Sequence, residues 1–408
     1  MRVSVVISKF LPEYTGAAYR IFNTYRRVSS ANTKIDLRYY CNSTQFPFNK
    51  SYEYEGIPVE RVAFGLSTWL PERIGRALKF YLEAIGTFRK LLCNKKPDVI
   101  HIVGSSGGTA AALIYSRLFE IPRLVELVTR DASPEQFLPG LRYRNFLNLN
   151  SRTILIAISP QIAERCAALG YSANVWCRPN PVDEDRFVFD RARKDKERKE
   201  LTPFGSEVTV IGMVAKFMPQ KNQIFLIDVL KRLPENFTLL LAGPVVSEGI
   251  FVERDQQYFR KIVDRVTELG LTSRVHIISE FVDAARIMAA CDIYAMPQMK
   301  EGLGTPMLEA MAVGLPVIVN ADEPALKYWA DRAPGSAACA LLTEDWSEAV
   351  LAVDAVLEKD LGVVSEKILK CAGSKALDES FLGVLEAICR DPGDIPSLME
   401  SLSAKHEA

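Results

Sequence analysis

The chain has 408 residues, of which 48% are hydrophobic and 25% charged, a composition typical of a folded protein with two or three domains. Its 50 basic and 50 acidic residues cancel, which argues against a nucleic-acid partner. Eight scattered cysteines without a CxxC pair, beside only three histidines, predict no structural zinc site and a reducing cytosol as the location. The N-terminal apolar run is too short for a signal peptide. No apolar stretch approaches the roughly 18 residues that cross a bilayer.

Strands and helices alternate through the first part of the chain. Residues 2–7 are predicted to form a buried strand, 12–16 a glycine-bearing loop and 17–29 a helix, the opening unit of a Rossmann-like domain. The same alternation continues with strands at 97–103, 121–128 and 154–158 and helices at 109–119 and 159–169. This order predicts a parallel sheet with helices on both faces.

Ligands of such a sheet bind at the carboxyl ends of its strands. That rule points to Gly16, Gly104–Gly108 and Thr129–Asp131. Gly16 is compatible with either a simple turn or a close approach to a ligand. His101 lies within a predicted strand, so we expect a buried, hydrogen-bonded residue there and no site residue.

Residues 69–96 are predicted to form one long helix or two. Seven basic residues stand here against two acidic ones, and Trp69 and three further aromatic residues accompany them. A basic amphipathic helix of this kind can lie on an anionic membrane surface. The alternative is an ordinary domain helix with a solvated basic face.

A second Rossmann-like unit is predicted to follow the charged stretch Arg191–Glu200, itself read as a solvated helix or linker. After a strand at 208–214, Lys216 and Lys221 lie in the loop that leads to a helix at 223–233. Two ammonium groups at a helix N-terminus suit a diphosphate, although they could also be surface lysines.

Short elements continue to the end of this unit. Strands are predicted at 237–243, 275–278, 293–297 and 316–320, and helices at 259–269 and 284–290. A last helix is expected at Phe381–Arg390, and 391–408 is read as a polar, partly frayed tail.

The stretch Glu301–Pro316 is a glycine-rich loop followed by a short helix. Thr305 is predicted to cap the helix, and Pro306 to take its first position. Gly314 suits the left-handed residue after the helix, and Pro316 prevents its continuation. Such a loop at a helix N-terminus is an anion site.

Two carboxylates, Glu301 and Glu309, flank this anion site, and glycines at 302 and 304 allow a close approach. Carboxylates accept hydrogen bonds from sugar hydroxyls, so the site suits a molecule with both phosphates and hydroxyls. On the residues alone, Glu301 could equally be a loop charge and Glu309 a side chain favoured by the helix dipole.

These segments carry a resemblance to a known family. The stretch Glu301–Pro316 resembles the glutamate-pair signature of retaining glycosyltransferases with the GT-B fold, in particular family 4, also called group 1. Residues 180–187 resemble that family's N-G-V-D-x-x-x-F segment, and 216–221 its G-R-x-x-x-x-K motif with lysine in place of arginine. Residues 281–282 are similar to the segment whose backbone meets the nucleotide base.

The resemblance implies two Rossmann-like, doubly wound parallel-sheet domains that face each other across a cleft. Residues 1–187 would form an acceptor domain and 188–375 a nucleotide-sugar domain. Residues 376–408 would form a helix that crosses back to the first domain, plus the tail. The protein would be cytoplasmic, or bound at the inner face of the membrane through 69–96.

The implied reaction moves a sugar from a UDP-, GDP- or ADP-linked donor to a glycan or lipid-linked acceptor in polysaccharide biosynthesis, with retention and without an obligatory metal or other cofactor. Glu301, Lys216 and Lys221 would be catalytic. The donor would contact these three and Gly16, Phe281, Val282, Gly302, Leu303, Gly304, Thr305 and Glu309. Two alternatives are a nucleotide-sugar epimerase and a degenerate member that binds a glycan or partner without turnover.

Overall fold

The chain forms two compact units. Unit 1 consists of Met1–Pro181 together with Lys375–Ala408, and unit 2 of Val182–Ser374. The structure is a computed structural model that describes residues 1–31, 34–65, 69–129, 131–136, 145–188, 190–247, 251–299, 302–332, 337–340, 343–354 and 361–407.

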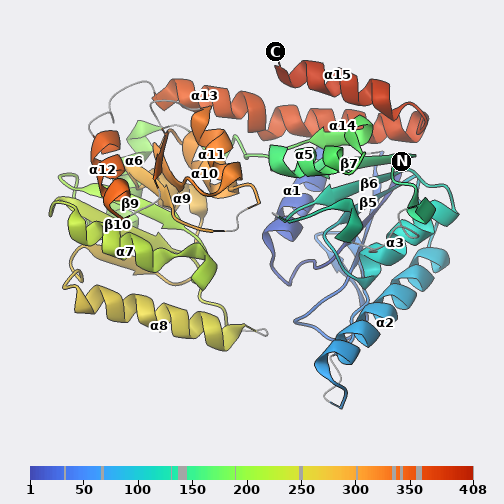
Figure 1. The fold of residues 1–408 in the computed structure, drawn as a ribbon, viewed down its shortest axis with the longest axis horizontal. Coiled ribbons are helices and arrows are strands. Elements are labelled where there is room, and N and C mark those ends of the chain that lie inside the picture. Colours follow the sequence, from blue (N-terminus) through green and yellow to red (C-terminus); the bar gives the residue numbers. More distant parts are fainter. Residues whose placement is uncertain are drawn as a thin grey trace. The chain divides into compact units, whose positions relative to one another are not determined.

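Unit 1 is built on a sheet with the strand order β3-β4-β2-β1-β5-β6-β7-β8. Strands β5, β6 and β7 of this sheet are labelled in Figure 1. Neighbouring strands are parallel except β3 and β4, which form an antiparallel hairpin. Central strands such as β5 are buried at every position, as expected for a parallel sheet covered on both faces. The strands are β1 (Arg2–Ile7), β2 (Asp36–Cys41), β3 (Lys50–Tyr54), β4 (Ile57–Arg61), β5 (Val99–Val103), β6 (Arg123–Leu127), β7 (Thr153–Ala157) and β8 (Val175–Cys177).

The helices of unit 1 come from both ends of the chain. They are α1 (Gly16–Ala31), α2 (Glu72–Cys93), α3 (Gly107–Leu118), α5 (Pro160–Ala168), α14 (Ser374–Arg390) and α15 (Ile395–Glu407), with short 3-10 turns at Pro134–Gln136 and Ser172–Asn174. The first residue of α14, Ser374, still belongs to unit 2. The predicted elements of this part are therefore present, with ends shifted by a few residues. Strands β2, β3, β4 and β8 are additional to those predicted.

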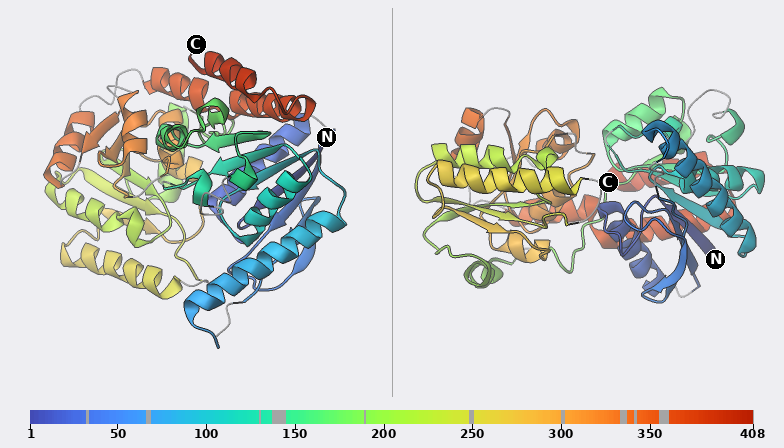
Figure 2. Two further views of the ribbon diagram at one scale, coloured as in Figure 1. Left: turned by 45° about the vertical axis from the view of Figure 1, so that its right-hand side comes forward. Right: turned by 90° about the horizontal axis from the view of Figure 1, so that it is seen from below.

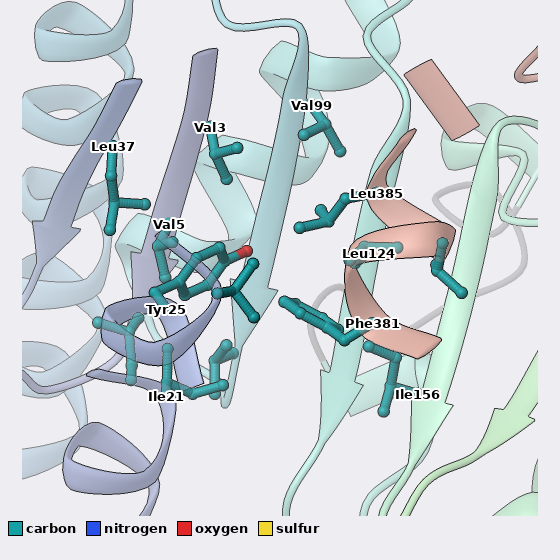
Figure 3. Close-up of a cluster of buried hydrophobic side chains, with 14 of the residues drawn as sticks. Val3, Val5, Ile21, Tyr25, Leu37, Val99, Leu124, Ile156, Phe381 and Leu385 are labelled. Carbon is teal, nitrogen blue, oxygen red and sulfur yellow. The ribbon is translucent and has the colours of Figure 1, made fainter. Parts of the chain in front are cut away.

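The core of unit 1 contains residues that are far apart in the sequence. In Figure 3, Phe381 and Leu385 of α14 point into the same apolar cluster as Tyr25 of α1 and Val3 and Val5 of β1. The ring of Phe381 lies 5.5 Å from that of Tyr25, edge to face. Helix α14 is therefore part of the unit 1 core.

The C-terminal segment is not the polar tail that was predicted. After α14 the chain turns back, and α15 runs beside it (Figures 1 and 2). Ile395, Met399 and Leu402 of α15 are buried in the unit 1 core. Their spacing of four and three residues gives one apolar helix face, a signal that the polar average of the segment concealed.

Helices α2 and α3 pack together through small residues, and they lie side by side in Figures 1 and 2. A side chain on Gly107 would collide with the backbone carbonyl of Phe80, and one on Gly108 with Asn42 and Thr87. The two glycines that open α3 therefore let α2 approach its backbone closely.

Unit 2 contains a parallel sheet with the order β11-β10-β9-β12-β13-β14. Its strands are β9 (Thr209–Val214), β10 (Phe237–Ala242), β11 (Val275–Ile278), β12 (Ile293–Met296), β13 (Val317–Asn320) and β14 (Ala337–Ala340). Its helices are α6 (Arg191–Leu201), α7 (Gln223–Arg232), α8 (Val252–Glu268), α9 (Ala284–Ala289), α10 (Thr305–Ala312), α11 (Pro324–Asp331), α12 (Thr343–Asp354) and α13 (Leu361–Ala372).

The charged stretch Arg191–Glu200 forms helix α6, but α6 is not a solvated linker. Arg198 is buried and pairs with Asp292, which also forms an ion pair with Lys194. Glu197 is buried between Arg193 and Arg286, whose nitrogens lie 3.1 and 2.6 Å away. These ion pairs hold α6 against the rest of unit 2, because Asp292 and Arg286 come from distant parts of the sequence.

Candidate active site

The loop between β9 and α7 holds the two predicted lysines. Lys216 follows β9, and its carbonyl accepts a 2.9 Å hydrogen bond from Gln223 Nε2. Phe217 is fully buried and fixes the start of the loop. Lys221 ends a 3-10 turn, and Asn222 then takes a left-handed conformation (φ 58°) that starts α7. Both lysines are partly exposed on a well-anchored loop.

The segment before α10 turns sharply at Gly304. This residue has φ 83°, and a side chain on it would collide with Leu326. Leu303 is buried beside it. The helix begins at Thr305 with Pro306 in second place, so the prediction that Thr305 caps the helix was wrong by one residue. The reason is that Gly304, with its left-handed backbone, supplies the turn that a capping side chain otherwise stabilises.

The other end of α10 follows the prediction. Gly314 is left-handed, with φ 81°. Its N–H donates to the Met311 carbonyl at 3.0 Å, and the Leu315 N–H donates to the Ala310 carbonyl at 2.9 Å. These two bonds are those of a Schellman motif, which satisfies the last carbonyls of the helix.

The structure brings the lysine loop and the segment before α10 together. They follow β9 and β12, which are neighbouring parallel strands, at the carboxyl edge of one sheet. The Met299 N–H donates to the Gln220 carbonyl at 3.3 Å, and Asn222 Nδ2 donates to the Pro297 carbonyl at 3.4 Å. Ligands of such sheets bind at this edge. Glu301 lies outside the described residues.

Glu309 lies in the middle of α10 and is partly exposed. Its carboxyl is nevertheless largely withdrawn from water, which is the main reason that its pKa is raised to about 8; the positive charge of Arg186 acts in the opposite direction and the negative charges of Asp183 and Asp283 act in the same one. Arg186 and Asp283 form an ion pair of 2.9 Å. The predicted ribose-binding carboxyl therefore has charged neighbours from two other segments, which sequence reasoning had not connected to it.

Phe281 and Val282 lie between β11 and α9, in the same unit. Phe281 is 68% exposed, and Val282 is partly buried. The next residue, Asp283, caps α9 through a 3.0 Å bond from the Ala285 N–H. An exposed aromatic ring on a capped turn is a suitable surface for a planar group.

Gly16 belongs to unit 1, where it is the first residue of α1. A side chain there would meet nothing within 4 Å, so neither space nor backbone conformation requires glycine. The preceding Thr15 hydroxyl accepts the Ala18 N–H at 3.1 Å. Of the other unit 1 candidates, Gly104 has φ 72°, and Arg130 lies outside the described residues.

His101 is a structural residue, as predicted. Its ring lies 3.1 Å from the Tyr25 hydroxyl and 3.2 Å from Glu126 Oε2, and it is fully buried. Burial lowers the pKa of His101. Burial acts to raise the pKa of Glu126, but the ion pair with Arg20 and the bond from His101 hold it at about 2.

Two negative findings concern the described residues. No group of three or more histidines, cysteines, aspartates or glutamates among them is placed to hold a metal ion. Within the same residues, no helix is long and apolar enough to cross a membrane.

Comparison with known proteins decides the family. A model of a glycosyl transferase 4-like domain matches residues 39–181, and a model of glycosyl transferases group 1 matches residues 194–367. The second match includes the lysine loop and all of α10. The chain belongs to the group 1 glycosyltransferases.

Among curated proteins, this group 1 glycosyltransferase is similar to an Escherichia coli UDP-Gal:alpha-D-GlcNAc-diphosphoundecaprenol alpha-1,3-galactosyltransferase, with 25% identity over 59% of this chain and 62% of that one. It is 31% identical to the putative glycosyltransferase EpsF of Bacillus subtilis over 35% of each chain. A lipopolysaccharide core biosynthesis glycosyltransferase, LpsE of Rhizobium meliloti, is 28% identical over 56% of this chain and 57% of its own. The chain thus spans 35 to 62% of the length of these relatives.

Solved structures confirm the fold of the group 1 glycosyltransferase. Anabaena Alr3699/HepE in complex with UDP matches with a TM-score of 0.70 at 18% identity, over 95% of this chain and 100% of that chain. Sucrose-phosphate synthase from Thermosynechococcus elongatus matches with a TM-score of 0.72 at 16% identity, over 95% and 99%. The predicted GT-B class, with two α/β units on parallel sheets, is correct.

Proposed function

We propose that this chain is a retaining glycosyltransferase that moves a sugar from a nucleotide-diphosphate sugar to a glycan or lipid-linked glycan acceptor. One observation carries the proposal: the lysine loop and the segment before α10 are hydrogen-bonded neighbours at the carboxyl edge of the unit 2 sheet. Two cationic side chains beside a helix N-terminus provide the positive charge that a diphosphate needs.

In the proposed reaction, the bond between the sugar C1 and the diphosphate oxygen breaks as the acceptor oxygen bonds to C1 on the same face. The acceptor proton passes to the leaving diphosphate. Lys216, Lys221 and backbone N–H groups around Gly302–Thr305 would stabilise the charge that develops on this leaving group, which is the largest catalytic contribution in many enzymes. Glu301 would contact the donor sugar and Glu309 the ribose hydroxyls.

Phe281 and Val282 would lie against the nucleotide base, and Gly16 would allow the phosphates or acceptor to approach α1. Uridine nucleotides are the first donor class to test. The name of the E. coli relative specifies UDP-Gal, and the similar Anabaena structure contains UDP. The same names favour transfer over the epimerase and binding-only alternatives.

A lipid-linked acceptor would require contact with a membrane, and α2 offers a surface for it. Large apolar residues at helical spacing are exposed along one face of α2, which we call the α2 face: Ile74, Leu78, Tyr81, Leu82 and Ile85. Of the exposed arginines of α2, Arg89 shares the side of this face by helical spacing. Apolar side chains beside cationic ones suit the interface of an anionic phospholipid surface.

Thermal stability against UDP, GDP, ADP and their sugars, with and without magnesium, tests the donor site. A nucleotide at about 100 times its Kd adds about 2.7 kcal/mol and raises Tm by a few degrees. We expect a shift with one base class, independent of magnesium. Lys221→Ala should abolish both the shift and transfer, whereas Lys261→Ala, an exposed lysine on α8, should leave both unchanged.

Two results would contradict the proposal. The first is a folded wild-type protein whose Tm responds to none of these nucleotides. The second is a Lys221→Ala variant that hydrolyses or transfers the donor sugar at the wild-type rate.

A further inference from the structure

The carboxyl edge of the unit 1 sheet carries loops that are bonded to one another. Glu13, in the loop after β1, is buried and accepts the Thr44 N–H at 3.1 Å and the Thr44 hydroxyl at 2.7 Å, both in the loop after β2. Asn42 Nδ2, in that same loop, donates to the carbonyl of Val62, just after β4, at 2.7 Å. The loops that follow these three adjacent strands therefore lie together, at the edge where parallel sheets bind their ligands.

Arg61 is the last residue of β4, lies at this edge and is only 5% exposed. Its guanidinium carbon lies 4.7 Å from the ring centroid of Phe46 and 4.6 Å from that of Phe48, both in the loop after β2. The ring of Tyr52 lies 5.6 Å away, and its hydroxyl donates to the Leu11 carbonyl at 2.5 Å. The guanidinium is therefore held among three aromatic rings, and we call Arg61 with these rings the Arg61 cage.

No described residue neutralises the charge of Arg61. Its Nε is buried without a hydrogen-bond partner, and none of its guanidinium N–H groups donates to a residue that the structure describes. The adjacent carboxylate, Glu60, points to the opposite face of the strand, as alternation along β4 requires. There it pairs with Arg38 and Lys90, at 3.5 and 2.9 Å. The fold therefore supplies aromatic rings to Arg61 but no anion.

The other buried arginines of the described chain all donate to an oxygen. The pairs are Arg198 with Asp292, Arg178 with Asp378 at 3.4 Å, and Arg123 with the Thr153 hydroxyl at 2.8 Å. A buried charge without such bonds is costly. Cation–π attraction in the Arg61 cage lowers that cost, but a ring face does not take up the N–H donors in the guanidinium plane. An anion from outside the fold would.

We propose that Arg61 binds an anionic group, a phosphate or a carboxylate, of a saccharide acceptor at the carboxyl edge of unit 1. The guanidinium fork matches the paired oxygens of either anion. Phe48 is 51% exposed, so its ring also offers a face on which a sugar can pack. Gly16, where an acceptor would approach α1, follows the same loop as Glu13. The inference rests on the proposed function, which requires a glycan acceptor, and it gives that acceptor a negative charge.

Nitrogen-15 NMR of the arginine side chains tests the inference on the full chain. The Arg61 Nε–H signal is assigned by its contacts with the rings of the Arg61 cage and by its loss in Arg61→Lys. It is followed during titrations with inorganic phosphate, glucose 1-phosphate, glucuronate and glucose, in the presence of the nucleotide that raises Tm, which occupies the lysine loop. We expect saturable shifts with anionic probes and none with glucose. A response to glucose 1-phosphate but not glucuronate assigns a phosphate, and the reverse assigns a carboxylate.

Calorimetric titration of variants measures the contribution of Arg61. Arg61→Gln should bind the responding probe at least about tenfold more weakly, because charge-assisted hydrogen bonds are lost. The Tm shift with nucleotide should stay, because Arg61 belongs to unit 1. Arg38→Gln is the matched control: it removes the same charge from the neighbouring strand β2, where Arg38 pairs with Glu60, and should leave probe binding unchanged. Circular dichroism establishes that each variant is folded, and the wild-type NMR titration needs no variant that folds.

Three results would overturn the inference. They are an Arg61 signal that no anionic probe shifts, a shift with glucose as large as with its phosphate, and a folded Arg61→Gln variant with wild-type affinity for the probe. Failure of the proposed function gives a different pattern. If no nucleotide raises Tm but the Arg61 signal responds to anions in titrations without nucleotide, the proposed function fails and the anion site stands. If nucleotides bind and the Arg61 signal responds to no anion, only the inference fails.

Discussion

Two glycines at helix starts differ in whether the fold requires glycine. Gly304 has a left-handed backbone and no room for a side chain next to Leu326, so the fold itself requires glycine there. Gly16 has neither constraint, since a side chain would meet open space. The fold therefore gives no reason for glycine at position 16, whereas a ligand that approaches this backbone would give one.

Gly16→Ala separates these two kinds of glycine. We expect unchanged or slightly higher stability, by up to about 1 kcal/mol, because alanine loses less chain entropy on folding. Transfer should fall at least several-fold if a ligand approaches this backbone. Thermal unfolding and initial rates of transfer measure the two effects.

Gly383→Ala provides the control for that variant. Gly383 lies on the exposed side of α14, and a side chain there also meets nothing within 4 Å. Its replacement should raise stability by about 0.5–1 kcal/mol without affecting transfer. Equal transfer rates for both variants and the wild type would remove Gly16 from the site.

At the scale of elements, α2 has an unusual distribution of side chains. Its buried positions include Gly75, Glu83 and Thr87, while large apolar residues on its α2 face are exposed. Part of the reason is the close packing on α3, because the backbone of α2 at Phe80 and the side chain of Thr87 lie against Gly107 and Gly108 with no space for further atoms. An apolar stripe normally marks the buried side of a helix, but here the packing on α3 leaves it outside.

Replacing both Ile74 and Ile85 by serine tests the α2 face as a membrane surface. We expect the wild-type protein to sediment with phosphatidylglycerol vesicles and the variant to bind at least tenfold more weakly, because each isoleucine contributes about 1.5–3 kcal/mol when buried in an apolar phase. Both residues are more than half exposed, so folding stability should change by less than about 1 kcal/mol.

The matched control for the α2 face is a Val263→Ser, Leu351→Ser double variant. These residues are exposed on α8 and α12 of unit 2, each at 43%. This variant should bind vesicles like the wild type. Equal binding of wild type to phosphatidylcholine and phosphatidylglycerol vesicles would show that the basic residues of α2 contribute nothing.

For the whole molecule, the important feature is that unit 1 is discontinuous in sequence. The chain leaves it at Pro181 and returns at Lys375, and α14 then fills a core otherwise built from residues before 181. Phe381, Leu385 and Ile388 are each buried among strands and helices of that first segment. Folding of unit 1 therefore has to wait for the end of the chain.

Phe381→Ala should destabilise unit 1 alone. Replacing a buried phenylalanine by alanine costs about 3–5 kcal/mol, and the ring contacts Tyr25 and Trp176 within this unit. Hydrogen exchange followed by mass spectrometry should show faster exchange in 1–181 and 375–408 and unchanged exchange in 182–374.

Trp346→Ala gives the reciprocal result. Trp346 is buried in the unit 2 core against Phe225, with ring centroids 5.3 Å apart. Exchange should then increase in 182–374 only. If either variant accelerates exchange equally in both segments, the two units do not fold as separate cooperative bodies.

Many strands and helices could be predicted, and some could not, for a physical reason. Strands such as β5 and β9 are short apolar runs, and α10 ends with the glycine expected of a left-handed residue. The β3–β4 hairpin was not predicted, because its turn is Glu55–Gly56, with φ 46° and 79°, and not an asparagine–glycine pair. Its alternating Tyr52 and Tyr54 were the available signal.

By itself the sequence determined two α/β units, the lysine loop, the glycine-rich start of α10 and the family, because these depend on local periodicity and on residues close along the chain. Only the tertiary structure decided that Arg186 pairs with Asp283, that buried ion pairs hold α6 in place, and that α15 completes unit 1. These features join residues dozens to hundreds of positions apart, and which distant charges or apolar faces meet is settled by packing.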